Sequence, residues 1–184
     1  TGTGTRIFFR PDVEIFDDVV FDAETIRTRL EIKSYLTPGL RVVLKDEKGK
    51  TRDEFKHDGG IGDMLTNLME RKGHEVIHPD PLRFGSENAD ESGSRVDIVL
   101  QWTESTDEHV YSFANGIPTV DGGTHAAGLR DGVAAAMMNY LEAHDAIPRG
   151  GEIKRSDIRE GLVRICDVLL RAPQCQGQTT QTLN

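Results

Sequence analysis

Apolar residues recur every three or four positions in three stretches of the chain, which is the spacing of amphipathic helices. The three predicted helices cover residues 21–36, 59–72 and 124–144. Asp22 and Thr124 belong to the residue types that cap a helix N-terminus, and Gly73 stands where a helix commonly ends. The apolar stripe of the second stretch, which includes Met64 and Met69, is predicted to face the core.

Short runs rich in β-branched and aromatic residues predict strands. They cover residues 6–10, 40–44, 51–55, 96–102, 109–113 and 163–170. The short spacing between neighbouring runs predicts two hairpins, one that joins 40–44 to 51–55 and one that joins 96–102 to 109–113.

The remaining segments are predicted to be loops and turns. Residues 79–94 gather Pro, Gly, Ser and acids, which is typical of a loop, and residues 115–123 hold three glycines and a proline, which indicates an ordered turn. Residues 156–160 have capping-box spacing for a short helical turn that starts at Ser156. Because strands, hairpins and helices interleave, the pattern favours an α/β (α+β) fold, a mixed sheet with helices on one face.

The composition limits the compartment and the partners. At 184 residues the chain suits one domain, and its net charge of -9 means that any contact with DNA needs a local cluster of Arg or Lys. Cys166 and Cys175 are predicted to be free thiols, and no apolar run approaches the roughly 20 residues of a membrane helix. We therefore expect a soluble, cytoplasmic protein. The chain begins without Met, inside a predicted strand, so we expect it to be a piece of a longer polypeptide.

Ordered motifs run through the whole chain. They occupy residues 2–5, 34–40, 57–61, 112–118, 121–125 and 157–162, and a last one occupies residues 173–180. Together they resemble the transducer domain of the ATPase subunit of bacterial type IIA DNA topoisomerases, a family that includes the B subunits of DNA gyrase and topoisomerase IV. The resemblance spans essentially all of the sequence.

The resemblance implies a fold and a role. The fold is the ribosomal protein S5 domain 2-like α/β sandwich, with an unusual left-handed βαβ crossover. Residues 1–184 form one transducer domain, in which residues 1–10 are the strand that leaves an upstream GHKL-type ATPase domain and residues 173–184 form a nucleotide-sensing loop. The domain couples ATP binding and hydrolysis in the adjacent GHKL domain to DNA strand passage, and it is not catalytic in isolation.

The resemblance also implies site residues. In the family, a glutamine and a lysine touch the terminal phosphate of the nucleotide, where positive charge stabilises the transition state. Gln178 matches that glutamine, and Thr180 takes the position of that lysine. Thr5 matches a threonine at the edge of the nucleotide pocket, and Arg130 faces a DNA-sized cavity of the closed dimer.

The implied cofactor is ATP with Mg, bound mainly by the upstream domain and not by this segment alone. The implied partners are the adjacent GHKL ATPase domain, a second copy of the subunit, a gyrase A or topoisomerase IV A-type subunit, and DNA that passes through the dimer cavity. No membrane partner is expected.

Three positions depart from the family pattern. Thr180 brings neither the charge nor the reach of a lysine, Cys175 stands where Phe is usual, and Ala135 lies near a common Arg. Thr180 leaves two alternatives open: a subunit with slow or rearranged ATP hydrolysis, or a stand-alone or degenerate interaction module without ATPase coupling. An independent kinase would need a phosphate loop that this sequence lacks, and the acidic charge disfavours RNA binding.

The histidines are predicted to be structural. His74 and His78 have a spacing that suits a metal only on a helix, whereas Gly73 and Pro79 indicate a loop. We therefore predict no metal site. His125 is predicted to pack or to cap the helix that follows residue 123.

Overall fold

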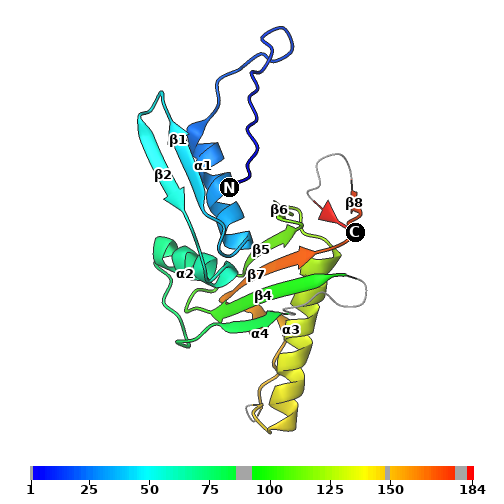
Figure 1. Cartoon of the computed structure of the whole chain (residues 1–184). Coiled ribbons are helices and arrows are strands. Elements are labelled where there is room, and N and C mark those ends of the chain that lie inside the picture. The colour runs from blue at the N-terminus through cyan, green and yellow to red at the C-terminus, as the bar shows by residue number, and fades with distance from the viewer. Residues whose placement is uncertain (1, 86–92, 148–149, 177–181) are drawn as a thin grey trace.

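The structure, a computed structural model, describes residues 2–85, 93–147, 150–176 and 182–184, with the backbone only at 175–176. Its helices are α1 (Ala23–Leu36), α2 (Ile61–Lys72), α3 (Thr124–Ala143) and α4 (Arg155–Arg159). Its strands are β1 (Val42–Asp46), β2 (Thr51–Phe55), β3 (Leu82–Gly85), β4 (Arg95–Trp102), β5 (His109–Ala114), β6 (Ile117–Pro118), β7 (Leu162–Leu169), β8 (Cys175–Gln176) and β9 (Thr182–Leu183). The predicted α/β class with a mixed sheet is confirmed (Figure 1).

The central sheet has the strand order β3-β4-β7-β5-β6. β7 is antiparallel to β4 and parallel to β5, so the predicted hairpin between β4 and β5 is wrong. The physical reason lies in β7, because all its residues except Asp167 and Leu169 are buried. A strand that is buried to this degree needs neighbours on both edges, and it therefore separates the two strands that are adjacent in sequence.

Helices cover both faces of this sheet. The first face packs Val163 and Ile165 of β7 against α1 and α2 in a cluster that also contains Ile61, Leu65 and Val99. The second face packs the alternate β7 residues, Cys166 and Val168, against Leu129 of α3 and Leu183 of β9. The prediction that helices lie on one face is therefore wrong in this detail: α3 covers the opposite face, because side chains alternate across a strand.

The predicted hairpin β1–β2 is confirmed, and it packs on α1. Asp22 caps α1 as predicted, since its carboxylate accepts hydrogen bonds from the backbone N–H groups of Glu24 and Thr25. The hydroxyl of Thr25 also donates to this carboxylate. This side-chain bond lowers the pKa of Asp22 most, and the backbone bonds lower it further. Gly73 ends α2 in the left-handed conformation, also as predicted.

A tight turn positions the edge of the sheet. Asn115 and Gly116, between β5 and β6, have φ values of 52° and 75°, the signature of a two-residue hairpin turn. The Asn115 amide then bonds both backbone groups of Leu170: Nδ2 donates to the carbonyl at 2.9 Å, and the N–H donates to Oδ1 at 2.7 Å. The turn thus fixes the end of β7 to the end of β5.

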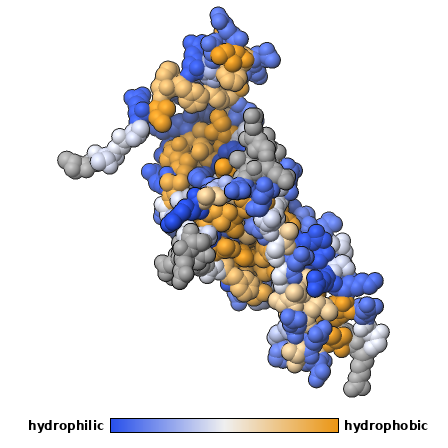
Figure 2. Space-filling view, turned by 90° about the vertical axis from the view of Figure 1, so that its right-hand side faces the viewer, coloured by the Kyte–Doolittle hydropathy of each residue, from blue (hydrophilic) through white to orange (hydrophobic). Residues whose placement is uncertain are grey.

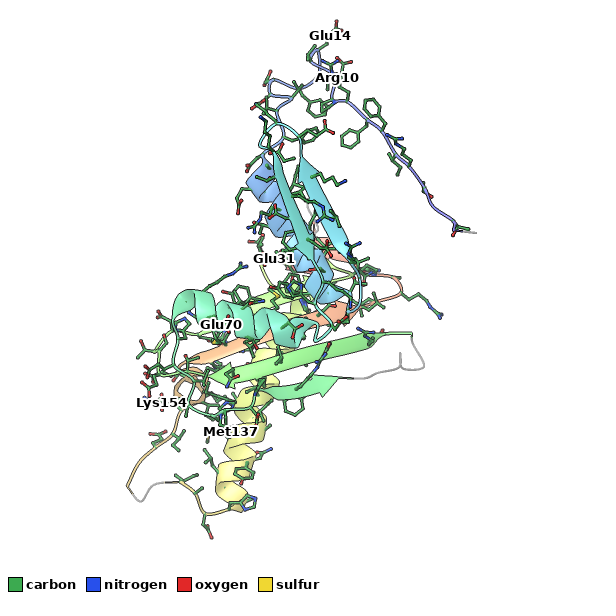
Figure 3. All side chains as sticks on the ribbon, turned by 60° about the vertical axis from the view of Figure 1, so that its left-hand side comes forward. Arg10, Glu14, Glu31, Glu70, Met137 and Lys154 are labelled. Atoms are coloured by element: carbon green, nitrogen blue, oxygen red, sulfur yellow. The ribbon has the colours of Figure 1, made fainter. Side chains whose placement is uncertain are left out.

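The segment before α1 differs from the prediction. Residues 6–10 belong to no strand, and Ile7, Phe8 and Phe9 are 83%, 90% and 70% exposed. Figure 3 shows this segment, with Arg10 and Glu14, extending away from the body of the molecule. A strand needs a partner for its N–H and C=O groups, and the described part of the chain offers none here.

Two loop predictions also need correction. β3 lies inside the predicted loop at 79–94, because this short run pairs with β4 as an edge strand, with Phe84 opposite Ile98. The ordered turn at 115–123 contains β6, which pairs with the end of β5.

Two helix caps also differ from the prediction. Gly123, not Thr124, is the N-cap of α3, and it makes no side-chain cap bond. The short helix α4 begins earlier than Ser156: the N–H of Lys154 donates to Asp157 Oδ2 at 2.9 Å. In the described residues, no helix has the length and apolar character needed to cross a bilayer.

Candidate functional site

The C-terminal hairpin of β8 and β9 is fixed to the N-terminus of α3. Leu183 of β9 is 2% exposed, and its N–H donates to the carbonyl of Gly122 at 3.2 Å. Gly123 has a φ of +143°, and a Cβ placed there would lie 2.3 Å from the carbonyl oxygen of Leu183. Only glycine permits so close an approach of two backbones. The hairpin and the helix are therefore connected by a backbone-to-backbone contact of Leu183 with Gly122 and Gly123, which we call the joint.

Residues 177–181, which connect β8 to β9, lie outside the described residues. Gln178 and Thr180 fall within them, so their contact with a nucleotide stays a prediction. The side chain of Cys175 is likewise outside what the structure describes. Thr5 is described: it is exposed in the irregular N-terminal segment, and its role also stays a prediction.

A polar cluster lies just behind the joint. The Ser112 hydroxyl bonds the carbonyl and the hydroxyl of Thr119 at 3.1 and 2.7 Å, and Thr119 Oγ1 lies 3.1 Å from His125 Nε2. Burial lowers the pKa of His125. The prediction that His125 is a packing residue fits this position, since its ring links the first turn of α3 to the β6 segment.

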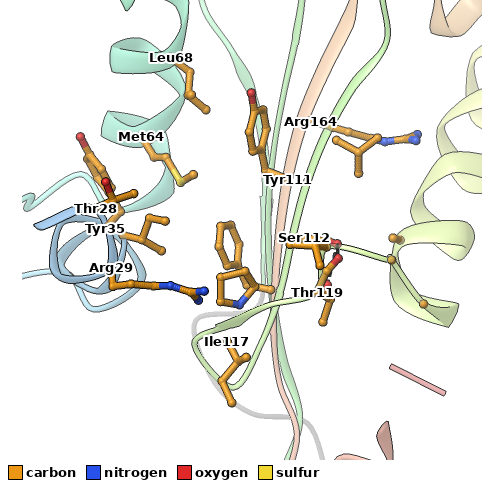
Figure 4. A pocket seen from close by; sticks show the side chains of 18 of the residues that line it. Thr28, Arg29, Tyr35, Met64, Leu68, Tyr111, Ser112, Ile117, Thr119 and Arg164 are labelled. Atoms are coloured by element: carbon orange, nitrogen blue, oxygen red, sulfur yellow. Dashed lines mark hydrogen bonds between the residues drawn. The ribbon is translucent and has the colours of Figure 1, made fainter. Parts of the chain in front are cut away.

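A large cavity opens beside the edge of β5, and we call it the β5 cavity. Its volume is about 800 Å³, and it is lined by α1, α2, β5, the segment from Ile117 to Gly123, and the first two turns of α3 (Figure 4). β6 pairs only with Phe113 and Ala114, which leaves the earlier part of β5 at the cavity wall. Apolar residues gather around the middle of the molecular face shown in Figure 2.

Arg130, predicted to face DNA, is exposed on α3 and lines the β5 cavity. Arg71 of α2 lines it too, but Arg71 is bound to Glu31 at 2.6 Å. Ala135, where an Arg is common in the family, lies further along α3 and is half-buried. Arg130 is therefore a cation of α3 at the cavity, whereas its contact with DNA stays a prediction.

Sequence reasoning missed Arg164, the most deeply buried cation of the described chain. Its side chain is 3% exposed, and one of its nitrogens, Nη2, lies 2.7 Å from Glu108 Oε1. Arg159 Nε lies 3.4 Å from the other oxygen of Glu108, within ion-pair range but without hydrogen-bond geometry. A signal was present in the sequence, because Arg164 interrupts the apolar run at 163–170 at an inward-facing position.

Burial affects two further groups on β7. It raises the pKa of the Asp167 carboxyl to about 6, with a smaller contribution in the same direction from Asp97, which is directly opposite on β4. Asp97 is itself paired with Arg83 at 3.0 Å, whereas Asp167 Oδ1 is buried without a hydrogen-bond partner among the described residues. Burial also raises the pKa of the Cys166 thiol to about 11, which makes this thiol unreactive.

The two histidines considered for metal binding have structural surroundings. His78 Nε2 accepts the N–H of Trp102 at 3.1 Å, and its Nδ1 lies 2.7 Å from the carbonyl of Asp80. The rings of His74 and His109 are tilted by 43° to each other, with centroids 5.5 Å apart. Over residues 2–85, 93–147, 150–176 and 182–184, no three His, Cys, Asp or Glu side chains are placed to hold a metal ion.

Solved structures share this arrangement. The gyrase B protein of Myxococcus xanthus superposes with a TM-score of 0.77 at 30% identity, over 95% of this chain and 48% of that one. The 43K ATPase domain of gyrase B from Thermus thermophilus superposes with a TM-score of 0.78 at 28% identity, over 94% and 45%. The fold is therefore that of a gyrase B-like domain of type IIA topoisomerases.

The sequence comparisons identify the family. The profile of DNA gyrase B matches residues 60–184, and the gyrase B protein of Clostridium acetobutylicum is 34% identical over 98% of this chain. The chain belongs to the DNA gyrase B family. It spans only 28% of the length of that relative, so it corresponds to one part of such a protein.

Proposed function

We propose that this chain is the transducer domain of an ATP-dependent type IIA DNA topoisomerase, and that it couples ATP binding and hydrolysis in an adjacent GHKL domain to DNA strand passage. The observation that supports the proposal most is the joint between the C-terminal hairpin and α3. A loop that senses the nucleotide can act only if a change in its position is transmitted to the rest of the molecule. The bond from Leu183 to Gly122 provides that connection.

In this proposal the loop at 177–181 carries Gln178 and Thr180 to the terminal phosphate of ATP. β9 transmits the position of the loop to the first turn of α3, and α3, with 20 residues, extends it over about 30 Å. Arg130 on this helix faces the DNA that passes through the dimer cavity. Thr5 lies at the edge of the nucleotide pocket, where the preceding domain ends.

The exposed apolar residues of the N-terminal segment support a neighbouring domain. Ile7, Phe8 and Phe9 are more than two-thirds exposed. Burial of apolar side chains of this size against a partner releases a favourable free energy, because it removes their surface from water. We assign that partner to the GHKL ATPase domain, which holds ATP with Mg. A second copy of the subunit, a gyrase A or topoisomerase IV A-type subunit, and DNA complete the cytoplasmic assembly.

The mass of the native polypeptide that carries this sequence tests the proposal. A mass several-fold above 20.4 kDa is expected, since an ATPase domain and a region that binds the A-type subunit should accompany this one. A native polypeptide of 20.4 kDa would contradict the proposal. As a control, the 184-residue chain alone is expected not to hydrolyse ATP, because one loop does not form the nucleotide pocket of an ATPase.

The second candidate function is a degenerate interaction module without ATPase coupling. Thr180 favours it, because a hydroxyl cannot replace the charge of the lysine that the family pattern places there. Thr180→Lys in the native polypeptide separates the candidates. A rise in ATP turnover supports a coupled subunit that lacks one cation, whereas no turnover in either form supports the degenerate module.

A further inference from the structure

Arg164 is a buried guanidinium whose charge is only partly balanced. It lies on the α3 face of β7, between the apolar neighbours Val163 and Ile165 that point to the other face. Its bond to Glu108 uses one nitrogen, Nη2. The other two, Nε and Nη1, are buried without a hydrogen-bond partner among the described residues. Buried N–H donors that lack a partner are rare in native proteins, and each calls for an explanation.

The surroundings of Arg164 carry a surplus of positive charge. Burial lowers the pKa of Arg164, and the charges of Arg130 and Arg159 add to this effect, whereas Glu108 is the main group that opposes it. Two guanidinium groups, those of Arg164 and Arg159, thus share the carboxylate of Glu108, and the charge of Arg130 acts on Arg164 as well, within a chain whose net charge is -9. An uncompensated cluster of cations in an acidic protein indicates a place where an anion belongs.

The β5 cavity borders this cluster. Arg164 and Arg130 both line it, and the small residues Ala126 and Ala127 form the neighbouring wall on α3. Figure 4 shows the Arg164 side chain extending from β7 towards α3. Arg130 is exposed at the same cavity, so one cation is accessible from solvent and the other lies behind it.

We propose that the β5 cavity binds a small phosphate-type oxyanion between Arg130 and Arg164. Arg164 turns a free N–H group towards the cavity and keeps its bond to Glu108, and Arg130 closes over the anion from the solvent side. Hydrogen bonds between a guanidinium and an oxyanion are among the strong ones, and low polarity around them strengthens them further. A DNA duplex cannot reach a side chain that is 3% exposed, so the ligand is a small anion, free or as the phosphate of a mononucleotide.

The test uses the 184-residue chain and measures thermal unfolding and calorimetric binding with inorganic phosphate and with AMP, at constant ionic strength set by NaCl. Phosphate is expected to raise the midpoint of unfolding, and both probes are expected to bind. Arg164→Met and Arg130→Met should each weaken binding about tenfold or more, because each removes a charged donor. Arg71→Met is the matched control: Arg71 lines the same cavity but is already paired with Glu31, so affinity should change by less than about twofold.

Folding of the variants is checked separately by circular dichroism, and Arg130→Met changes an exposed residue, so it keeps the test valid if Arg164→Met fails to fold. If phosphate does not bind, or binds equally well to Arg130→Met, the proposal is overturned. A DNA duplex that binds through Arg130 while phosphate and AMP do not would also overturn it, since an exposed charge and not the cavity would then hold the phosphate.

Discussion

The two faces of the central sheet differ in how they are packed. On the α1/α2 face, Ile61, Leu65, Val99 and Ile165 are no more than 2% exposed and form a continuous apolar core. On the α3 face, the only buried residues of α3 are two alanines, Ala126 and Ala134. That face also contains the buried Arg164 and the backbone joint to β9. We therefore expect the α1/α2 face to supply most of the stability, whereas the α3 face holds the elements that we connect with function.

The comparison predicts that truncation of the apolar core has the largest effect. Leu65→Ala should lower the free energy of unfolding by about 2–5 kcal/mol, because it leaves a cavity in a site that is 1% exposed. Leu129→Ala, the counterpart on α3, should cost clearly less, since Leu129 is only half-buried. Urea denaturation of both variants measures the difference. Equal losses would mean that the two faces contribute alike.

The joint on the α3 face should be sensitive to a single methyl group. Gly123→Ala places a Cβ against the Leu183 carbonyl and strains a positive φ, which should cost about 1–3 kcal/mol and release β9. Gly128→Ala is the matched control, because nothing lies within 4 Å of its Cβ in the same helix. Hydrogen exchange at the Leu183 amide reports the release. Unchanged protection in Gly123→Ala would show that the joint is not rigid.

Asp167 provides a pH-dependent contrast with Asp97, the carboxylate opposite. The pKa of Asp167 is raised from 3.8 to about 6, so the folded state binds its proton more tightly than the unfolded state does. The contribution of Asp167 to stability should therefore fall as pH rises from about 4 to 6, and Asp167→Asn should gain roughly 1–3 kcal/mol over the unchanged chain at about pH 7.5 but almost nothing at about pH 4. Asp97→Asn, which breaks the pair with Arg83, should not stabilise the chain. Urea unfolding at both pH values decides; a gain for Asp167→Asn that is equal at the two pH values would exclude this origin.

The smallest expected effect concerns Cys166. Its thiol is 2% exposed and its pKa is about 11, so iodoacetamide at about pH 8 should leave it unmodified in the folded chain. Peptide mapping by mass spectrometry distinguishes this residue from Cys175. Rapid modification of Cys166 without denaturant would show that the α3 face opens readily.

Local signals in the sequence were sufficient for the helices. The Asp22 cap, the Gly73 end of α2 and the β1–β2 hairpin follow from residue types and spacing, and all three agree with the structure. Strand order was not predictable in this way, because β7 pairs with β4 and β5 over a long sequence separation that no local pattern encodes. The position of α3 was not predictable either, because the sheet face that it covers depends on which side chains of β7 point to it.

In the candidate site, too, local features could be predicted from the sequence, whereas contacts between distant segments could not. The glycines at 122 and 123 were recognised as a turn, but their role as the contact surface of β9 depends on a residue 60 positions later, Leu183. Arg164 was overlooked because its environment is built from distant segments that bring Glu108 and Arg159 to it. Gln178 and Thr180 rest on the family resemblance.

The central claim is that β9 passes the state of the nucleotide loop to α3, and hydrogen exchange by mass spectrometry tests it most directly. The native polypeptide is compared with and without a non-hydrolysable ATP analogue. We expect slower exchange at residues 182–184 and in the first turns of α3, and loss of the α3 change in Gly123→Ala. Protection that is confined to the segments before residue 22, with no change in β9 or α3, would contradict it.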